Sequence, residues 1–246
     1  MLTNEIMRKQ GQWLFRWRSY LPLLFLIFLI PAFRQYRDLF ENRYYNLFWE
    51  MGCLAVGLTG LGIRAATVGY APRNTSGRHT REQMAEALNT KGMYSLLRNP
   101  LYFGNFFLWS APVLFLHNLL LSLAFILIFV LYYERIIIAE EMFLQEKFGE
   151  MYTQWVSQTP VWFPRHFRWQ KPDIFFSWKT VIRREYHGFF GLIAAMTVMK
   201  HVSEIFLHQT AAPDQVWTAI FAVGTGIYLG IRFLAKQTKV LHVEGR

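Results

Sequence analysis

Six blocks of apolar residues divide the chain, and each has a length close to that of a membrane-spanning helix. They cover residues 19–33, 45–63, 101–116, 119–138, 188–207 and 216–234. A helix needs about 20 mostly apolar residues to cross the hydrocarbon core of a bilayer. The first and third blocks are short, and aromatic and long basic side chains at the interface can complete them. The pattern therefore predicts an all-α, multi-pass transmembrane protein with about six spans.

The polar breaks between the blocks differ greatly in length. Only His117 and Asn118 separate the third block from the fourth, so we expect these two spans to form a tight helical hairpin. The basic residues before the first block are not followed by a convincing cleavage site of small residues. The first block is therefore expected to be a retained span and not a removed signal.

The Lys and Arg residues follow the breaks between the blocks. Alternate breaks place 22 of them on one side of the membrane and three on the other, and Lys200 lies inside the fifth block. By the positive-inside rule, both termini and the two large loops are cytoplasmic. The sequence thus predicts an integral membrane protein, of the cytoplasmic (inner) membrane if the source is bacterial.

Composition narrows the possible functions. The chain has 246 residues, of which 53% are hydrophobic and 17% charged, and its net charge is +10. The positive charge follows the predicted topology, so it indicates a membrane surface and not a nucleic acid as the partner. The single Cys53 forms no internal disulfide. The seven histidines lack the spacing of metal ligands, and no metal site is expected.

The segment 92–105, with the sequence GMYSLLRNPLYFGN, holds the first candidate chemistry. Asn99 is a favoured helix N-cap and Pro100 a favoured first helical residue. Arg98 beside a helix N-terminus would form an anion-binding site. The alternative is that Arg98 marks the membrane interface and that Asn99 and Pro100 only begin a helix.

The segment 134–155 would continue the fourth span out of the bilayer. It carries several acidic residues, among them Glu140 and Glu141. They are either ordinary surface acids or part of a site. The aromatic and basic residues from 155 to 179 then predict a stretch that lies at the level of the lipid headgroups.

Some features predict packing and not chemistry. The glycines of GLTGLG, residues 57–62, and the pair Gly226 and Gly230 are typical of close helix contacts. His201 and Glu204 lie one helical turn apart and are expected to form a pair at the interface.

Taken together, these segments resemble the integral-membrane methyltransferases of the isoprenylcysteine carboxyl methyltransferase and phospholipid methyltransferase families. The resemblance covers approximately residues 57–165. The residues that carry it are Gly92, Tyr94, Arg98, Pro100, Tyr102, Gly104, Glu140, Glu141, Leu144, Phe148, Gly149, Tyr152, Trp155, Pro160 and Pro164, preceded by Gly60, Gly62, Arg64 and Gly69. Asn99 stands where the family has a histidine, and asparagine does not titrate. The spans after residue 187 lie outside the family core.

The resemblance implies a function and a site. Such enzymes bind S-adenosylmethionine between membrane helices and cytoplasmic segments and methylate a membrane lipid or a lipid-modified substrate. The sequence shows no clear candidate base, which favours an oxygen nucleophile such as a carboxylate or phosphate, because such a nucleophile needs no base. Arg98 and Glu141 are the candidate catalytic residues. The candidate cofactor-binding residues are Tyr94, Arg98, Asn99, Pro100, Tyr102, Gly104, Glu140 and Glu141.

The same resemblance divides the chain into three parts. Residues 1–56 hold the first spans, residues 57–165 the methyltransferase-like core, and residues 166–246 an interfacial segment with two further spans. Two other functions stay open. One is a membrane reductase that uses NADPH, similar to steroid reductases, and the other is a membrane scaffold without enzymatic activity.

Overall fold

The computed structural model describes residues 2–18, 27–72, 86–164, 167–209 and 213–243. These residues form helices and no strand, which confirms the predicted all-α class. The helices are α1 (Leu2–Trp17), α2 (Leu29–Arg34), α3 (Arg43–Val68), the short 3-10 helix η2 (Gly92–Ser95), α4 (Pro100–Phe115), α5 (Leu119–Phe148), α6 (Glu150–Gln158), α7 (Trp178–His208) and α8 (Gln215–Gln237).

Four helices are long and apolar enough to cross a membrane, namely α3, α5, α7 and α8. α4 has only 16 residues, which corresponds to about 24 Å against a hydrocarbon core of about 30 Å. Residues 19–26 of the first apolar block lie outside the described residues, and the rest of that block leads into α2. Six spans and cytoplasmic termini therefore stay predictions.

The tight hairpin is confirmed. α4 ends at Phe115 and α5 begins at Leu119, so three residues connect them. The Asn118 side chain caps α5 by accepting a 2.9 Å hydrogen bond from the backbone N–H of Leu121. His117 adopts φ of +37° at the turn. The hairpin returns the chain to the end of the bundle at which α4 begins.

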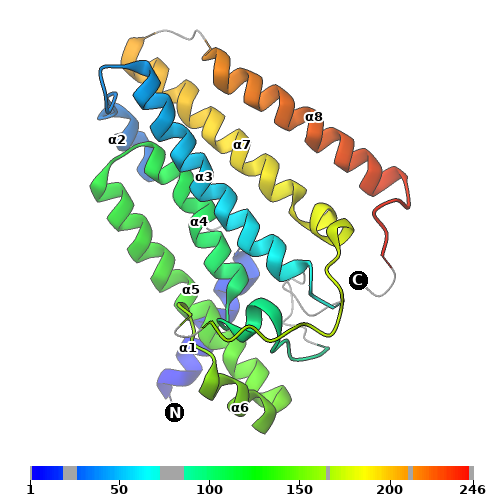
Figure 1. Cartoon of the computed structure of the whole chain (residues 1–246). Helices are drawn as coiled ribbons and strands as arrows, with labels where there is room; N and C mark the ends of the chain where they lie inside the picture. Colours follow the sequence, from blue (N-terminus) through cyan, green and yellow to red (C-terminus); the bar gives the residue numbers. More distant parts are fainter. Residues whose placement is uncertain (1, 19–26, 73–85, 165–166, 210–212, 244–246) are drawn as a thin grey trace.

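α3, α4 and α7 form the centre of the bundle, with α1 and α5 on one side and α8 on the other (Figure 1). α3 and α4 cross at Gly60 and Gly104, where a Cβ added to Gly60 would lie 2.5 Å from the Gly104 carbonyl oxygen. The packing role predicted for the glycines of residues 57–62 is confirmed for Gly57 and Gly60, and it is wrong for Gly62, which meets nothing within 4 Å. It is also wrong for Gly226 and Gly230, which face open space because α8 packs against α7 along one side only.

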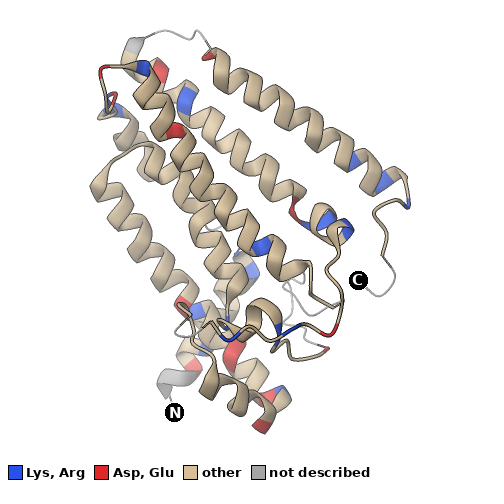
Figure 2. Ribbon diagram, in the orientation of Figure 1, with Lys and Arg blue, Asp and Glu red and all other residues tan. Residues whose placement is uncertain are grey.

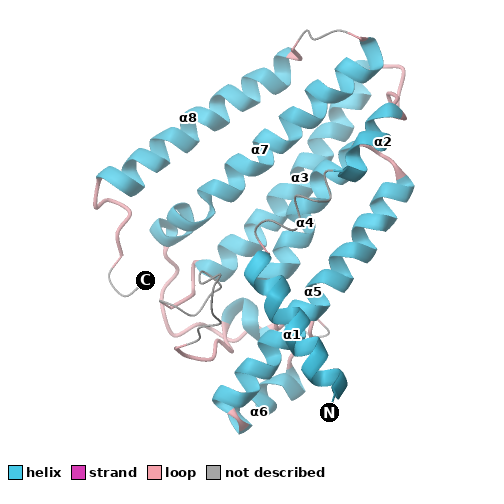
Figure 3. Ribbon diagram, turned by 180° about the vertical axis from the view of Figure 1, so that it is seen from behind, coloured by secondary structure: helices cyan, strands magenta, loops and turns pink. Residues whose placement is uncertain are grey.

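The basic N-terminal arm forms α1, a helix that the apolar pattern does not predict. α1 lies along the end of α5 that extends beyond the hairpin partner α4 (Figure 3). Arg8 on α1 forms an ion pair with Glu146 on α5, with 2.6 Å between Nη1 and Oε1. The extension of α5 is thus covered on one side by the N-terminal arm.

Charged residues gather at the bundle end where α3 stops and α4 starts, together with the outer parts of α1, α5 and α6 (Figure 2). The N-terminal end of the described chain lies toward this end too, as does the end of α8 (Figure 1). The predicted boundary at residue 57 falls within α3, which is one continuous helix from Arg43 to Val68.

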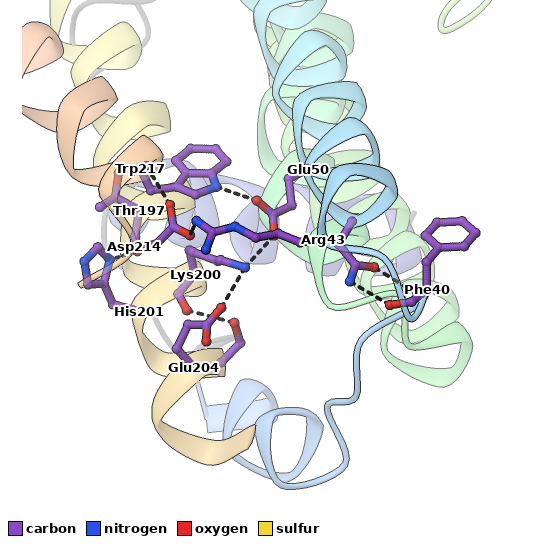
Figure 4. A network of polar contacts seen from close by, with 11 residues as sticks. Phe40, Arg43, Glu50, Thr197, Lys200, His201, Glu204, Asp214 and Trp217 are labelled. Atoms are coloured by element: carbon purple, nitrogen blue, oxygen red, sulfur yellow. Dashed lines mark hydrogen bonds and ion pairs between the residues drawn. The ribbon is translucent and has the colours of Figure 1, made fainter. Parts of the chain in front are cut away.

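A second charged cluster connects α3, α7 and α8 toward the opposite end of the bundle (Figure 4). The Lys200 ammonium lies 2.8 Å from a carboxylate oxygen of Glu50 and 2.8 Å from one of Glu204. The other Glu50 oxygen accepts a 2.6 Å hydrogen bond from the indole N–H of Trp217. The predicted pair of His201 and Glu204 is wrong, because Glu204 bonds to Lys200 while His201 contacts the Thr197 carbonyl.

Candidate active site

The start of α4 and the extension of α5 meet at the charged end of the bundle. The guanidinium of Arg98 lies 3.0 Å from a carboxylate oxygen of Glu141. One helical turn into α4, the Tyr102 hydroxyl donates a 2.8 Å hydrogen bond to Glu140. The four side chains are all partly exposed. Residues about 40 positions apart in the sequence thus form one polar cluster at the edge of the bundle.

Arg98 also holds the end of α6. Its Nε donates to the Thr159 carbonyl at 2.6 Å and its Nη2 to the Val156 carbonyl at 2.9 Å. Its backbone N–H donates to the Pro160 carbonyl at 2.9 Å. A guanidinium satisfies the free carbonyls of a helix C-terminus and interacts favourably with its dipole. The side chain of Arg98 therefore positions α6 and Glu141 and uses most of its hydrogen-bonding capacity for this.

Tyr94 lies next to the cluster, in η2. The Trp155 indole donates a 3.1 Å hydrogen bond to the Tyr94 carbonyl, which joins η2 to α6. Burial raises the pKa of the Tyr94 phenol, and the charge of nearby Glu140 raises it further. Gly92 begins η2 at φ of +62°, a conformation that favours glycine. Tyr94 is thus a protonated phenol held beside Glu140.

The remaining predicted residues have different environments. Asn99 occupies the N-cap position of α4 as expected, yet its side chain makes no capping bond. The Asn99 amide nitrogen is buried and has no hydrogen-bond partner among the described residues. Pro100 is the buried first residue of α4. Gly104 packs against α3, where an added Cβ would lie 2.7 Å from Cγ of Arg64. That contact by itself accounts for a glycine at position 104.

Sequence reasoning does not find a second ion pair beside the cluster. Arg64 on α3 forms a two-pronged pair with Glu185 on α7, with distances of 2.7 and 3.0 Å. Its Nη1 donates a 2.6 Å hydrogen bond to Asn105, and the Asn105 amide donates to the Tyr133 hydroxyl at 3.3 Å. The one sequence feature that points to Arg64 is its place in the pattern of Gly60, Gly62, Arg64 and Gly69, and no sequence feature points to Glu185.

The cluster leaves one carboxylate without a cationic hydrogen-bond partner. In the described part of the chain, Glu140 accepts a hydrogen bond from the neutral Tyr102 and forms no ion pair. Glu141 is paired with Arg98. The Tyr152 hydroxyl on α6 is buried and has no partner among the described residues. The cluster therefore combines a carboxylate that forms no ion pair with a buried hydroxyl that has no hydrogen-bond partner among the described residues, and such an unsatisfied group calls for an explanation.

Comparison with known proteins supports this interpretation. Residues 53–151 match the model of the phospholipid methyltransferase family (PEMT). No curated protein and no solved structure matches the chain. The matched segment contains the four residues of the cluster, Arg98, Tyr102, Glu140 and Glu141, and ends before Tyr152, and it confirms the resemblance that the sequence motifs carry. The family match indicates a methyltransferase.

Proposed function

We propose that the protein transfers a methyl group from S-adenosylmethionine to a membrane lipid or a lipid-modified substrate at the cluster of Arg98, Tyr102, Glu140 and Glu141. The observation that carries the proposal is the meeting of residues 98–102 with residues 140–141, through contacts of 3.0 and 2.8 Å. These are the residues in which the chain resembles the methyltransferase families.

The groups of the cluster fit the charges of the cofactor. S-adenosylmethionine carries a sulfonium and an ammonium cation and one carboxylate. Glu140, oriented by the Tyr102 hydroxyl, would face one of the cations. The unpartnered amide N–H of Asn99 would donate to an oxygen of the cofactor. Arg98 and Glu141 would act as positioning residues, because their charges already satisfy each other and the end of α6.

The side chains favour an oxygen nucleophile as methyl acceptor. When bound, the cofactor supplies an electrophilic methyl group on its sulfonium. A carboxylate or phosphate attacks without losing a proton, so in-line positioning and exclusion of water are sufficient. An amine must lose a proton first. The phenols of Tyr94 and Tyr152 stay protonated, because burial raises the pKa of each, and Glu140 would be occupied by a cation of the cofactor, so neither phenol nor this carboxylate would serve as the base.

The surroundings of the cluster support a lipid substrate. The cluster lies at one end of a bundle with four span-capable helices. The neighbouring segment that leads into α7 exposes large aromatic side chains, namely Phe167, Phe175 and Trp178. Exposed aromatic residues between basic ones are typical of a protein surface at lipid headgroups. We propose that this end faces the cytoplasm, that the cofactor enters from there, and that the lipid enters sideways between helices.

Methyl transfer by the purified full-length chain in nanodiscs of total membrane lipid tests the proposal. Labelled S-adenosylmethionine should transfer label to a lipid, and mass spectrometry should find a product that is heavier by one CH2 group. Absence of label transfer together with absence of cofactor binding would overturn the proposal. Quenching of tryptophan fluorescence by NADPH but not by S-adenosylmethionine would favour a reductase instead.

A further inference from the structure

The ion pair of Arg64 and Glu185 connects α7 with the candidate active site. The two side chains are mostly buried, with 23% and 9% of their surfaces exposed. Both carboxylate oxygens of Glu185 bond to the guanidinium of Arg64. This two-pronged geometry is the strongest form of such a pair. Glu185 lies outside residues 53–151, which match the methyltransferase family.

Arg64 reaches the site across Gly104. A side chain at position 104 would collide with the Arg64 stem, since an added Cβ lies 2.7 Å from its Cγ. The guanidinium of Arg64 then bonds to Asn105, and Asn105 bonds to the Tyr133 hydroxyl. The Tyr133 ring contacts that of Tyr102, with 4.6 Å between the centroids. Arg64 is therefore joined to the side chain that orients Glu140.

Arg64 is also close enough to affect the charge of the site. Both Arg64 and Glu140 act electrostatically on the phenols of Tyr94 and Tyr133. Arg184 acts on Tyr94 as well, and Arg18 acts on Glu140. An arginine that lost its carboxylate partner here would leave one positive charge uncompensated near Tyr94 and Tyr133, the two phenols on which Glu140 also acts. That charge would oppose the binding of a cationic ligand.

We infer that Glu185 is a positioning residue that neutralises Arg64 and so keeps the site selective for the positively charged form of the cofactor. α7 is then a functional part of the methyltransferase unit, although it lies outside the segment that matches the family. The inference rests on the proposed function, because it takes S-adenosylmethionine as the ligand.

The binding of two ligands that differ in charge tests this role. S-adenosylmethionine carries the sulfonium cation, and S-adenosylhomocysteine lacks it. Calorimetry of the full chain in nanodiscs should give both dissociation constants for the wild type, Glu185→Gln, Arg64→Gln and the double variant. Glu204→Gln is the matched control, since Glu204 is an ion-paired acid on the same helix in the other charged cluster.

Glu185→Gln should weaken S-adenosylmethionine about tenfold more than S-adenosylhomocysteine, since it leaves Arg64 unpaired. Arg64→Gln should change the ratio of the two constants in the opposite direction, and the double variant should restore it. Glu204→Gln should leave the ratio unchanged. A purely structural role would weaken both ligands equally in every variant, and that result would overturn the inference.

The two possible failures are distinguishable. If the wild type binds neither ligand, the proposed function itself is wrong. If the wild type binds both ligands and the ratio stays constant across the variants, only the role of Glu185 is wrong. If Glu185→Gln fails to fold, the two remaining variants still decide. A ratio of dissociation constants that changes in Arg64→Gln and returns to the wild-type value in the double variant would support the positioning role, and an unchanged ratio in both variants would support a purely structural role.

Discussion

The two charged clusters of the bundle use similar residues in opposite ways. In the cluster of Glu50, Lys200 and Glu204, the first two residues are buried, and both oxygens of Glu50 have a partner (Figure 4). In the candidate active site, Arg98, Glu140 and Glu141 are partly exposed, and Glu140 accepts a hydrogen bond from a neutral group. Charge alone therefore does not identify a site. Exposure and unused hydrogen-bonding capacity distinguish the candidate active site from the other cluster.

The comparison also separates stability from binding. A buried and fully paired cluster connects helices, and losing one partner leaves an uncompensated charge in the apolar interior. A partly exposed cluster loses less stability when it is altered, because water solvates what remains. Substitutions in the cluster of Glu50, Lys200 and Glu204 should thus change folding, and substitutions in the candidate active site should change ligand binding.

Lys200→Ala should have the largest effect on stability. It leaves Glu50 buried beside Trp217 without a cation, which we expect to cost about 3–5 kcal/mol of unfolding free energy. Thermal unfolding in detergent measures the loss. Lys236→Ala, at the exposed end of α8, is the matched control and should unfold like the wild type. Equal melting temperatures for both variants would contradict the stabilising role of the polar contacts that Glu50 on α3 makes with Lys200 on α7 and Trp217 on α8.

Arg98→Ala should have the next largest effect and should combine the two kinds of loss. It removes the side-chain bonds to the Thr159 and Val156 carbonyls and the pair with Glu141. We expect a loss of about 2–3 kcal/mol and release of the end of α6. Limited proteolysis should then cut near residues 150–160, and cofactor binding should weaken. Unchanged proteolysis would show that Arg98 does not hold α6.

Two glycines of one motif should give the smallest and most contrasting effects. Gly60→Ala places a Cβ 2.5 Å from the backbone of α4 and should cost about 1–3 kcal/mol. Gly62→Ala, two residues further along α3, meets nothing within 4 Å and should stabilise the helix by up to about 1 kcal/mol. The melting temperatures of the two variants should shift in opposite directions, and equal shifts would contradict the α3–α4 contact at Gly60.

Local patterns in the sequence predict a good part of this structure. Apolar blocks and caps predict the all-α class, the hairpin at His117 and Asn118, and the start of α4 at Pro100. The motif order indicates that residues 98–102 and 140–141 share a site, because the hairpin returns the chain to its starting level. Hydrophobic periodicity and capping signals depend on near neighbours, so they are readable from one sequence.

Contacts between distant residues are not readable in this way. Arg64 and Glu185 lie 121 positions apart, and Glu50 and Lys200 lie 150 positions apart. Nothing in the local sequence selects these partners. Helical spacing alone pairs Glu204 with His201, whereas Glu204 bonds to Lys200 in the structure. α1 is missed for a related reason. The apolar face of α1 packs against α5, a distant part of the chain. The charged residues of the arm interrupt the apolar pattern by which a span is recognised.

The central claim is that Glu140 binds a cationic methyl donor, and calorimetric titration with S-adenosylmethionine tests it most directly. Glu140→Gln should weaken binding by about tenfold to a hundredfold, since a charged hydrogen-bond partner contributes about 1.5–3 kcal/mol. Glu134→Gln is the matched control, because Glu134 is an exposed acid on the same helix, and it should bind like the wild type. Equal affinities for the wild type and Glu140→Gln would contradict the account.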